Sequence, residues 1–178
     1  MINNTSDKKI IFNNKILSLY KEGHSKINKS IITINAPTWV NIIAITNKNM
    51  IVFVRQFRYG SKSLTLEIPG GMVDEGESPL QAAKRELYEE TGYICEKIQR
   101  LGNISPNPAL FTNRVVSYLG LNASLKNFNI DNENEIDECV LINKNNVNKL
   151  IRKGEIDHAL VISAFHLFDL RTITKNRS

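Results

Sequence analysis

Glu86, Glu89 and Glu90 lie close together in the segment RELYEETG at 85–92. On an α-helix, which turns by about 100° per residue, their carboxylates fall within one arc of about 100°. Like charges at this spacing destabilise a helix by about 0.2–0.5 kcal/mol per pair unless a cation compensates them. Carboxylate oxygens are the ligands that Mg²⁺ and Mn²⁺ prefer. The pattern favours a divalent-cation site, and a solvated acidic helix face is the alternative.

The residues around these acids predict a helix with clear ends. Ser78 fits the N-cap, Pro79 the first helical position and Gln81 the capping-box partner. Gly92 fits the residue that ends the helix. One apolar face is expected to carry Leu80, Ala83 and Leu87.

The flanks of the helix strengthen the case for a site. Gly70 and Gly71 allow close approach of the backbone before the helix, and the acidic run DEGE at 74–77 lies at its entrance. Arg85 precedes Glu89 by one turn, so an ion pair between them would hold Glu89 in place.

These residues together form a spaced pattern that resembles the Nudix box, GX5EX7REUXEEXGU, in which U is a bulky apolar residue. Every defined position matches, although Tyr93 at the last U is slightly polar; the matching positions are Gly71, Glu77, Arg85, Glu86, Leu87, Glu89, Glu90, Gly92 and Tyr93. The resemblance continues on both sides, from about Trp39 to about Leu167. It implies the Nudix α/β/α sandwich, an α/β (α+β) fold with a mixed central sheet. The implied reaction is attack of water on a diphosphate that is linked to another group.

The resemblance also implies the roles of the box residues. Glu86 and Glu90 are expected to be the principal metal ligands, and Glu89 a third ligand or a water-positioning base. The carbonyl of Gly70 would complete a coordination sphere, and Glu77 would be a weaker ligand acting through water. Divalent cations neutralise and orient a diphosphate and acidify a bound water, so Mg²⁺ or Mn²⁺ is the expected cofactor.

Two further segments, VRQFRYG at 54–60 and LEIPGG at 66–71, resemble the hydrolases of ADP-ribose and other nucleoside-diphosphate sugars. That group has a proline after the box at the place where Pro108 stands. Arg55 or Arg58 is then expected to contact phosphate, which suits the bidentate geometry of arginine; a charged strand end is the alternative. Trp39 is expected either to stack on the nucleobase or to serve packing alone.

A second acidic segment, DNENEIDE at 131–138, resembles a mobile loop that carries the general base in this group. Glu133 and Glu135 are the two candidates for that catalytic base. A polar turn without a catalytic role is the alternative.

The rest of the chain predicts the elements that position these residues. Alternating and continuous apolar runs predict strands over 40–46, 50–57, 64–69, 93–101, 114–121 and 138–142, and helices over 145–153 and 157–170. Short apolar stretches within 9–35 predict further strands. We expect an N-terminal strand arm at 1–35 that contributes to a dimer, a Nudix hydrolase domain at 36–172 and a flexible tail at 173–178.

Composition excludes several classes of protein. A chain of 178 residues with 42% hydrophobic and 23% charged residues fits one globular domain rather than a membrane or mostly disordered protein. The net charge of +5 is too mild to indicate nucleic acid as a partner. Cys95 and Cys139 form no CxxC motif, and the polar N-terminus predicts no signal peptide, so we expect a cytoplasmic protein.

The sequence therefore predicts a homodimeric, metal-dependent hydrolase of ADP-ribose or a related nucleoside-diphosphate sugar. The products would be a nucleoside monophosphate and a sugar phosphate. One alternative is a pyrophosphohydrolase of nucleoside triphosphates or of RNA 5′ ends. The other is a non-catalytic ADP-ribose sensor.

Overall fold

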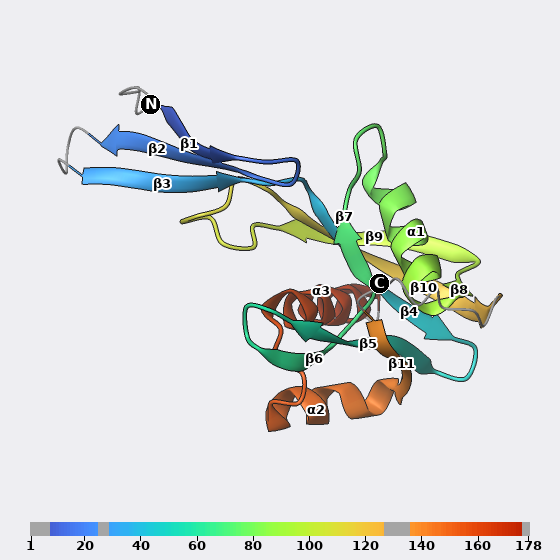
Figure 1. Ribbon diagram of the computed structural model, residues 1–178. Helices are drawn as coiled ribbons and strands as arrows, with labels where there is room; N and C mark the ends of the chain where they lie inside the picture. Colours follow the sequence, from blue (N-terminus) through green and yellow to red (C-terminus); the bar gives the residue numbers. More distant parts are fainter. Residues whose placement is uncertain (1–7, 25–28, 127–135, 176–178) are drawn as a thin grey trace.

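The computed structural model describes residues 8–24, 29–126 and 136–175, whose strands form one sheet of three strands and one of eight (Figure 1). The larger sheet runs in the order β11-β5-β4-β10-β8, with β6 paired to β5, β7 to β4 and β9 to β10. Its longer strands are β4 (Trp39–Thr46), β5 (Met50–Arg58), β9 (Lys97–Ile104), β10 (Val115–Leu125) and β11 (Ile136–Asn143). The shorter ones are β6 (Ser63–Glu67), β7 (Gly70–Met72) and β8 (Tyr93–Ile94).

The larger sheet is mixed, as the sequence predicts. β4 and β10 pair in parallel, whereas the other neighbours pair antiparallel. The segment 93–101, predicted as one strand, is divided into β8 and β9. These two strands pair with different parts of β10, β8 with its last residues and β9 with its first seven.

Helices cover both faces of this sheet: α1 (Pro79–Thr91) lies on one, and α3 (Ala159–Lys175) on the other (Figure 1). The short helices η1 (Lys144–Asn146) and α2 (Val147–Lys153) precede α3. No helix in the described ranges is long and apolar enough to cross a membrane. The mixed sheet between helices confirms the predicted α/β/α fold.

Strand β4 contributes to the cores on both faces. Val40, Ile42 and Ala44 pack with α1, whereas Ile43 and Ile45 pack with α3. Successive side chains of a strand point to opposite faces, so a strand that is covered twice needs an unbroken apolar run. This explains why the segment at 40–46 is apolar nearly throughout.

Helix α1 begins and ends where the sequence predicts. The Ser78 hydroxyl accepts the N–H of Gln81, and the Gln81 side chain accepts the N–H of Ser78, which completes the capping box. Gly92 ends the helix in the left-handed region, with φ of 70°. The predicted apolar face is partly wrong: Leu80, in the first turn, is 37% exposed. The buried apolar residues of the helix are Ala82, Ala83 and Leu87.

The N-terminal strands form a separate antiparallel sheet, β1 (Lys9–Asn13), β2 (Ser18–His24) and β3 (Lys29–Asn35), which extends away from the larger sheet (Figure 1). The backbone of Ile34 joins this arm to the rest of the molecule. Its N–H donates to Leu110 at 2.7 Å, and its carbonyl accepts the N–H of Thr112 at 3.0 Å. The arm exposes a run of large apolar side chains that includes Ile10, Ile11 and Phe12.

Candidate active site

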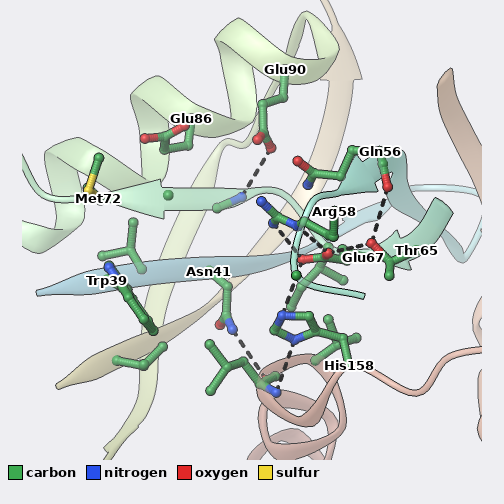
Figure 2. Close-up of a pocket in the computed structure, with 18 of the residues that line it drawn as sticks. Trp39, Asn41, Gln56, Arg58, Thr65, Glu67, Met72, Glu86, Glu90 and His158 are labelled. Carbon is green, nitrogen blue, oxygen red and sulfur yellow. Dashed lines mark hydrogen bonds and ion pairs between the residues drawn. The ribbon is translucent and has the colours of Figure 1, made fainter. Parts of the chain in front are cut away.

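A cavity of about 800 Å³ opens beside α1, β7 and the start of α3. Its lining includes six of the residues predicted from the sequence, namely Trp39, Arg58, Gly70, Glu86, Glu89 and Glu90. They come from the strands β4, β5 and β7 and from α1. Figure 2 shows Glu86 and Glu90 above β7, with Trp39 and Asn41 on the other side of that strand. The fold therefore brings together residues that are far apart in the sequence.

Glu90 is the most deeply placed of the three box carboxylates, with 9% of the residue exposed. Its Oε2 accepts the N–H of Gly70 at 3.1 Å. Burial, followed by repulsion from Glu86, raises the pKa of Glu90 to about 8. Burial also raises the pKa of Glu86, against the opposing effect of Arg85. A cation beside Glu90 would act against both effects, because a nearby positive charge favours the ionised carboxylate.

The Arg85 guanidinium holds several acids at once. It donates to Glu86 at 2.8 Å, to Glu89 at 3.1 Å, which is the predicted i,i+4 pair, and to Glu77 at 2.9 Å. Its Nη2 also donates to the carbonyl of Met72 at 3.0 Å. The hydrogen bonds from Arg85 lower the pKa of Glu77. Glu77 is absent from the cavity lining, and its water-mediated metal role stays a prediction.

Gly70 is needed because a side chain there would collide with the backbone of β4, and a side chain at Gly71 would displace the end of Glu86. A Cβ on Gly71 would overlap the carboxylate of Glu86, and a Cβ on Gly70 would overlap the carbonyl of Val40. Glu86 therefore rests directly against the backbone of β7. The structure places the N–H of Gly70 on Glu90; the predicted role of the Gly70 carbonyl stays a prediction.

Opposite these acids, Arg58 forms a two-pronged pair with Glu67. Nε and Nη2 of Arg58 donate to the two carboxylate oxygens of Glu67 at 2.7 and 2.9 Å. The Thr65 hydroxyl donates to Glu67 at 2.6 Å, and Nε2 of His158 lies 3.7 Å from it. Burial would raise the pKa of Glu67, but the bonds from Arg58 and Thr65 outweigh that effect and lower it.

Some predicted site residues lie elsewhere. Arg55 points away from the cavity lining and pairs with Glu138 of β11 at 3.3 Å. Pro108 lies in the loop between β9 and β10 and is absent from the cavity lining. Glu133 and Glu135 fall outside the described residues. The roles predicted for all four therefore stay predictions.

Trp39 does line the cavity, but it also packs against an aromatic neighbour. Its ring centroid lies 5.6 Å from that of Phe111, at an interplanar angle of 58°. The side chain thus has both the packing role and the cavity position that the sequence left open.

Sequence reasoning missed several polar residues that line the cavity, among them Gln56, Thr65, Glu67 and His158. For three of them a signal was present, because Gln56, Arg58, Thr65 and Glu67 occupy alternate positions on the neighbouring strands β5 and β6. His158 had no such signal. It reaches the cavity because Nδ1 accepts the N–H of Leu160 at the start of α3, which turns Nε2 toward Glu67.

The donor set fits a hard divalent cation. Glu86, Glu89 and Glu90 carry carboxylate oxygens, the donor type that such a cation prefers, and all three line the cavity. Within the described ranges, no group of three His, Cys, Asp or Glu side chains is already arranged around a common metal position. Arg85 pairs with both Glu86 and Glu89 in this structure.

Comparison with known proteins shows which family the chain resembles over most of its length. The ADP-ribose pyrophosphatase of Bacillus subtilis (strain 168) is 29% identical over 176 residues, which cover 94% of this chain and 92% of that protein. A methanol dehydrogenase activator of Bacillus methanolicus is 40% identical over 90 residues, or 51% of this chain and 49% of that protein. The crystal structure of an ADP compounds hydrolase superposes with a TM-score of 0.76 at 20% identity, covering 98% of this chain and 95% of that one.

The model of the NUDIX domain matches residues 37–165. This range includes the box, the residues that line the cavity, helix α1 and the start of α3. The chain belongs to the Nudix family, and the hydrolase box recognised in its sequence forms the acidic wall of the cavity.

Proposed function

We propose that this Nudix hydrolase cleaves the diphosphate bond of ADP-ribose or a related nucleoside-diphosphate sugar, giving a nucleoside monophosphate and a sugar phosphate. The observation that carries the proposal is the cavity in which the box carboxylates face Arg58 and Trp39. The near full-length similarity to a protein named ADP-ribose pyrophosphatase supports the substrate class.

The proposed cofactor is Mg²⁺ or Mn²⁺, held by Glu86, Glu89 and Glu90 with the carbonyl of Gly70, and through water by Glu77. When bound, such a cation supplies positive charge to the diphosphate and acidifies the attacking water. The oxygen donors and the burial of Glu90 support this choice. Glu89, with 49% of its side chain exposed, is the box carboxylate most open to substrate and water.

The remaining residues bind the substrate in this proposal. Arg58 contacts the diphosphate as a fixed fork, which suits the planar geometry of arginine. Trp39 stacks on the nucleobase. Arg55 and Pro108 lie outside the cavity of a single chain, so any contact they make with substrate requires a second chain or a moved loop. Glu133 or Glu135 is the proposed general base.

The two alternatives have less support. A non-catalytic ADP-ribose sensor would not need the carboxylates of Glu86, Glu89 and Glu90, which all line the cavity. A pyrophosphohydrolase of nucleoside triphosphates or RNA 5′ ends shares the box. However, the Bacillus subtilis relative that matches nearly the whole chain is named for ADP-ribose.

We also propose a homodimer in which the arm at 1–35 joins the hydrolase domain at 36–172 of a second chain, with 173–178 as a tail. The exposed apolar side chains of the arm support this arrangement, because such patches commonly mark interaction surfaces. The cytoplasmic location and the absence of a nucleic-acid partner remain predictions from composition.

The substrate is tested with ADP-ribose, ADP-glucose, GTP and an RNA that carries a 5′-triphosphate. Each is incubated with Mg²⁺, and both products are identified. We expect AMP and ribose 5-phosphate from ADP-ribose, and loss of most activity in Glu90→Gln with the fold intact by circular dichroism. Faster cleavage of GTP or RNA than of either ADP-sugar would contradict the proposal. Turnover by Glu90→Gln at the native rate would show that the metal assignment is wrong.

The burial of Glu90 predicts how stability depends on pH. With a pKa of about 8 in the folded chain, Glu90 stays protonated while the unfolded chain has lost that proton. In EDTA, the free energy of unfolding should therefore fall as the pH rises from about 5 to about 8. Mg²⁺ should stabilise the fold more at pH 8 than at pH 6, because it competes with the proton. Denaturant titrations of wild type and Glu90→Gln test this, and an equally steep fall in the variant would contradict it.

The general base is tested by kcat under saturating Mg²⁺ in Glu133→Gln, Glu135→Gln and the double variant. General-base assistance contributes about 10²–10⁴-fold, so replacing the true base should lower kcat by about that factor with little change in substrate affinity. We favour Glu133, and the Glu135 variant then serves as the matched control. If all three variants stay within about threefold of wild type, Glu89 becomes the better candidate.

The dimer is tested by light scattering at micromolar concentration. Wild type should have twice the mass of one chain, and the double variant Ile10→Glu, Phe12→Glu should be monomeric because it places charges on the apolar arm. Leu141→Glu introduces a charge at another exposed apolar position, on β11, and should remain dimeric. A monomeric wild type would reject the proposal.

A further inference from the structure

The pair between Arg58 and Glu67 stands out from the other ion pairs described because its carboxylate is almost completely buried. Glu67 is 4% exposed, whereas the partner of Arg55 on the same strand, Glu138, has 59% of its side chain exposed. Glu67 is held on both oxygens, with Arg58 on each of them and Thr65 on one. A buried carboxylate with this many donors has one orientation and imposes one on its partner.

Arg58 lies between the carboxylates of Glu67 and Glu90, for which different roles are proposed. Figure 2 shows its guanidinium between Glu67 and Glu90, the buried box glutamate. The electrostatic effects agree, since Arg58 lowers the pKa of Glu90 while Glu67 raises it. All three residues therefore lie within one electrostatic neighbourhood. An arginine placed between two carboxylates can in principle pair with either of them, and in this structure Arg58 pairs with Glu67.

We propose that Glu67 is a positioning residue that holds the Arg58 guanidinium toward the diphosphate and prevents it from pairing with Glu90. Glu90 then remains available to the divalent cation. The diphosphate part of the inference rests on the proposed function, whereas the cation part depends only on the geometry of this chain. Thr65 supports Glu67 directly, and His158 places the start of α3 against the same carboxylate.

Removal of Glu67 predicts a specific failure. Without its two-pronged partner, Arg58 can turn to the carboxylate of Glu90, which lies on its other side (Figure 2), and an ion pair between them would compete with Mg²⁺. Loss of a supporting partner around a metal site typically weakens metal affinity by about 10–100-fold. Removing Arg58 as well should relieve the competition, which a merely structural role of Glu67 would not predict.

The test is the dissociation constant of Mg²⁺ alone, measured by calorimetry without substrate. Glu67→Gln should raise this constant by about tenfold relative to wild type. The double variant Arg58→Ala, Glu67→Gln should return to within about twofold of Arg58→Ala alone. Glu67→Gln removes the same negative charge whether residue 58 is arginine or alanine. Any difference between its effects on the Mg²⁺ constant in these two backgrounds therefore passes through Arg58.

Two further variants complete the design. Glu138→Gln removes the partner of the other arginine on β5 and should leave the Mg²⁺ constant unchanged. Thr65→Val removes the hydroxyl bond to Glu67 without leaving a buried charge unpaired, and should raise the constant by a smaller factor of about two to three. Thr65→Val and the double variant keep the test possible if Glu67→Gln does not fold.

The inference is overturned if Glu67→Gln binds Mg²⁺ as tightly as wild type. It is equally overturned if Glu67→Gln weakens Mg²⁺ binding by the same factor in the Arg58→Ala background as in wild type. It is also overturned if Glu67→Gln fails to fold and Thr65→Val has no effect. Hydrolysis of ADP-ribose by wild type is measured separately. If wild type does not hydrolyse it but the Mg²⁺ constants behave as expected, the proposed function fails and the role of Glu67 stands.

Discussion

Repulsion among the carboxylates of Glu86, Glu89 and Glu90 is the constraint on which the arrangement of the cavity depends. One turn of α1 carries all three, and one of them is buried beside β7. Arg85 on the same helix compensates part of that charge, while the N–H of Gly70 satisfies one oxygen of Glu90. Burying acids in this way costs stability, and the apolar packing of α1 on the sheet offsets that cost.

The sheet supplies this packing because it is covered on both faces. Helix α1 packs on one face through Ala82, Ala83 and Leu87. Helix α3 packs on the other through Val161, Ala164 and Phe165. The cavity opens where the start of α3, β7 and α1 come together. The acids of the cavity lie on α1 and Arg58 lies on β5, a strand that packs in both cores, so the core that holds α1 also holds the strand of Arg58.

The sequence was sufficient to predict what depends on local spacing. The capping box at Ser78 and the acid arc of α1 follow from short-range patterns, whereas the sandwich with its mixed sheet was implied by the resemblance to the Nudix family. The sequence left Arg55 and Arg58 as alternatives: residues three apart on a strand point to opposite faces, but the sequence did not show which face borders the cavity. The sequence could not predict the pairing of Glu67 with Arg58 or the position of His158 near Glu67. Both depend on how β5, β6 and α3 meet in the folded chain. The interruption between β8 and β9 likewise depends on their pairing with β10.

The parallel pairing of β4 with β10 has a consequence for how the chain acquires its fold. Trp39 pairs with Val115, so the central strand of the sheet completes its second edge only with residues 76 positions further along. Non-local pairing of this kind slows folding, because a long loop must close before its contacts are made. During synthesis, β4, β5 and α1 emerge well before β10. The nascent chain therefore presents an apolar strand edge for several seconds at about 5–20 residues per second, an interval in which a chaperone or a second chain could bind it.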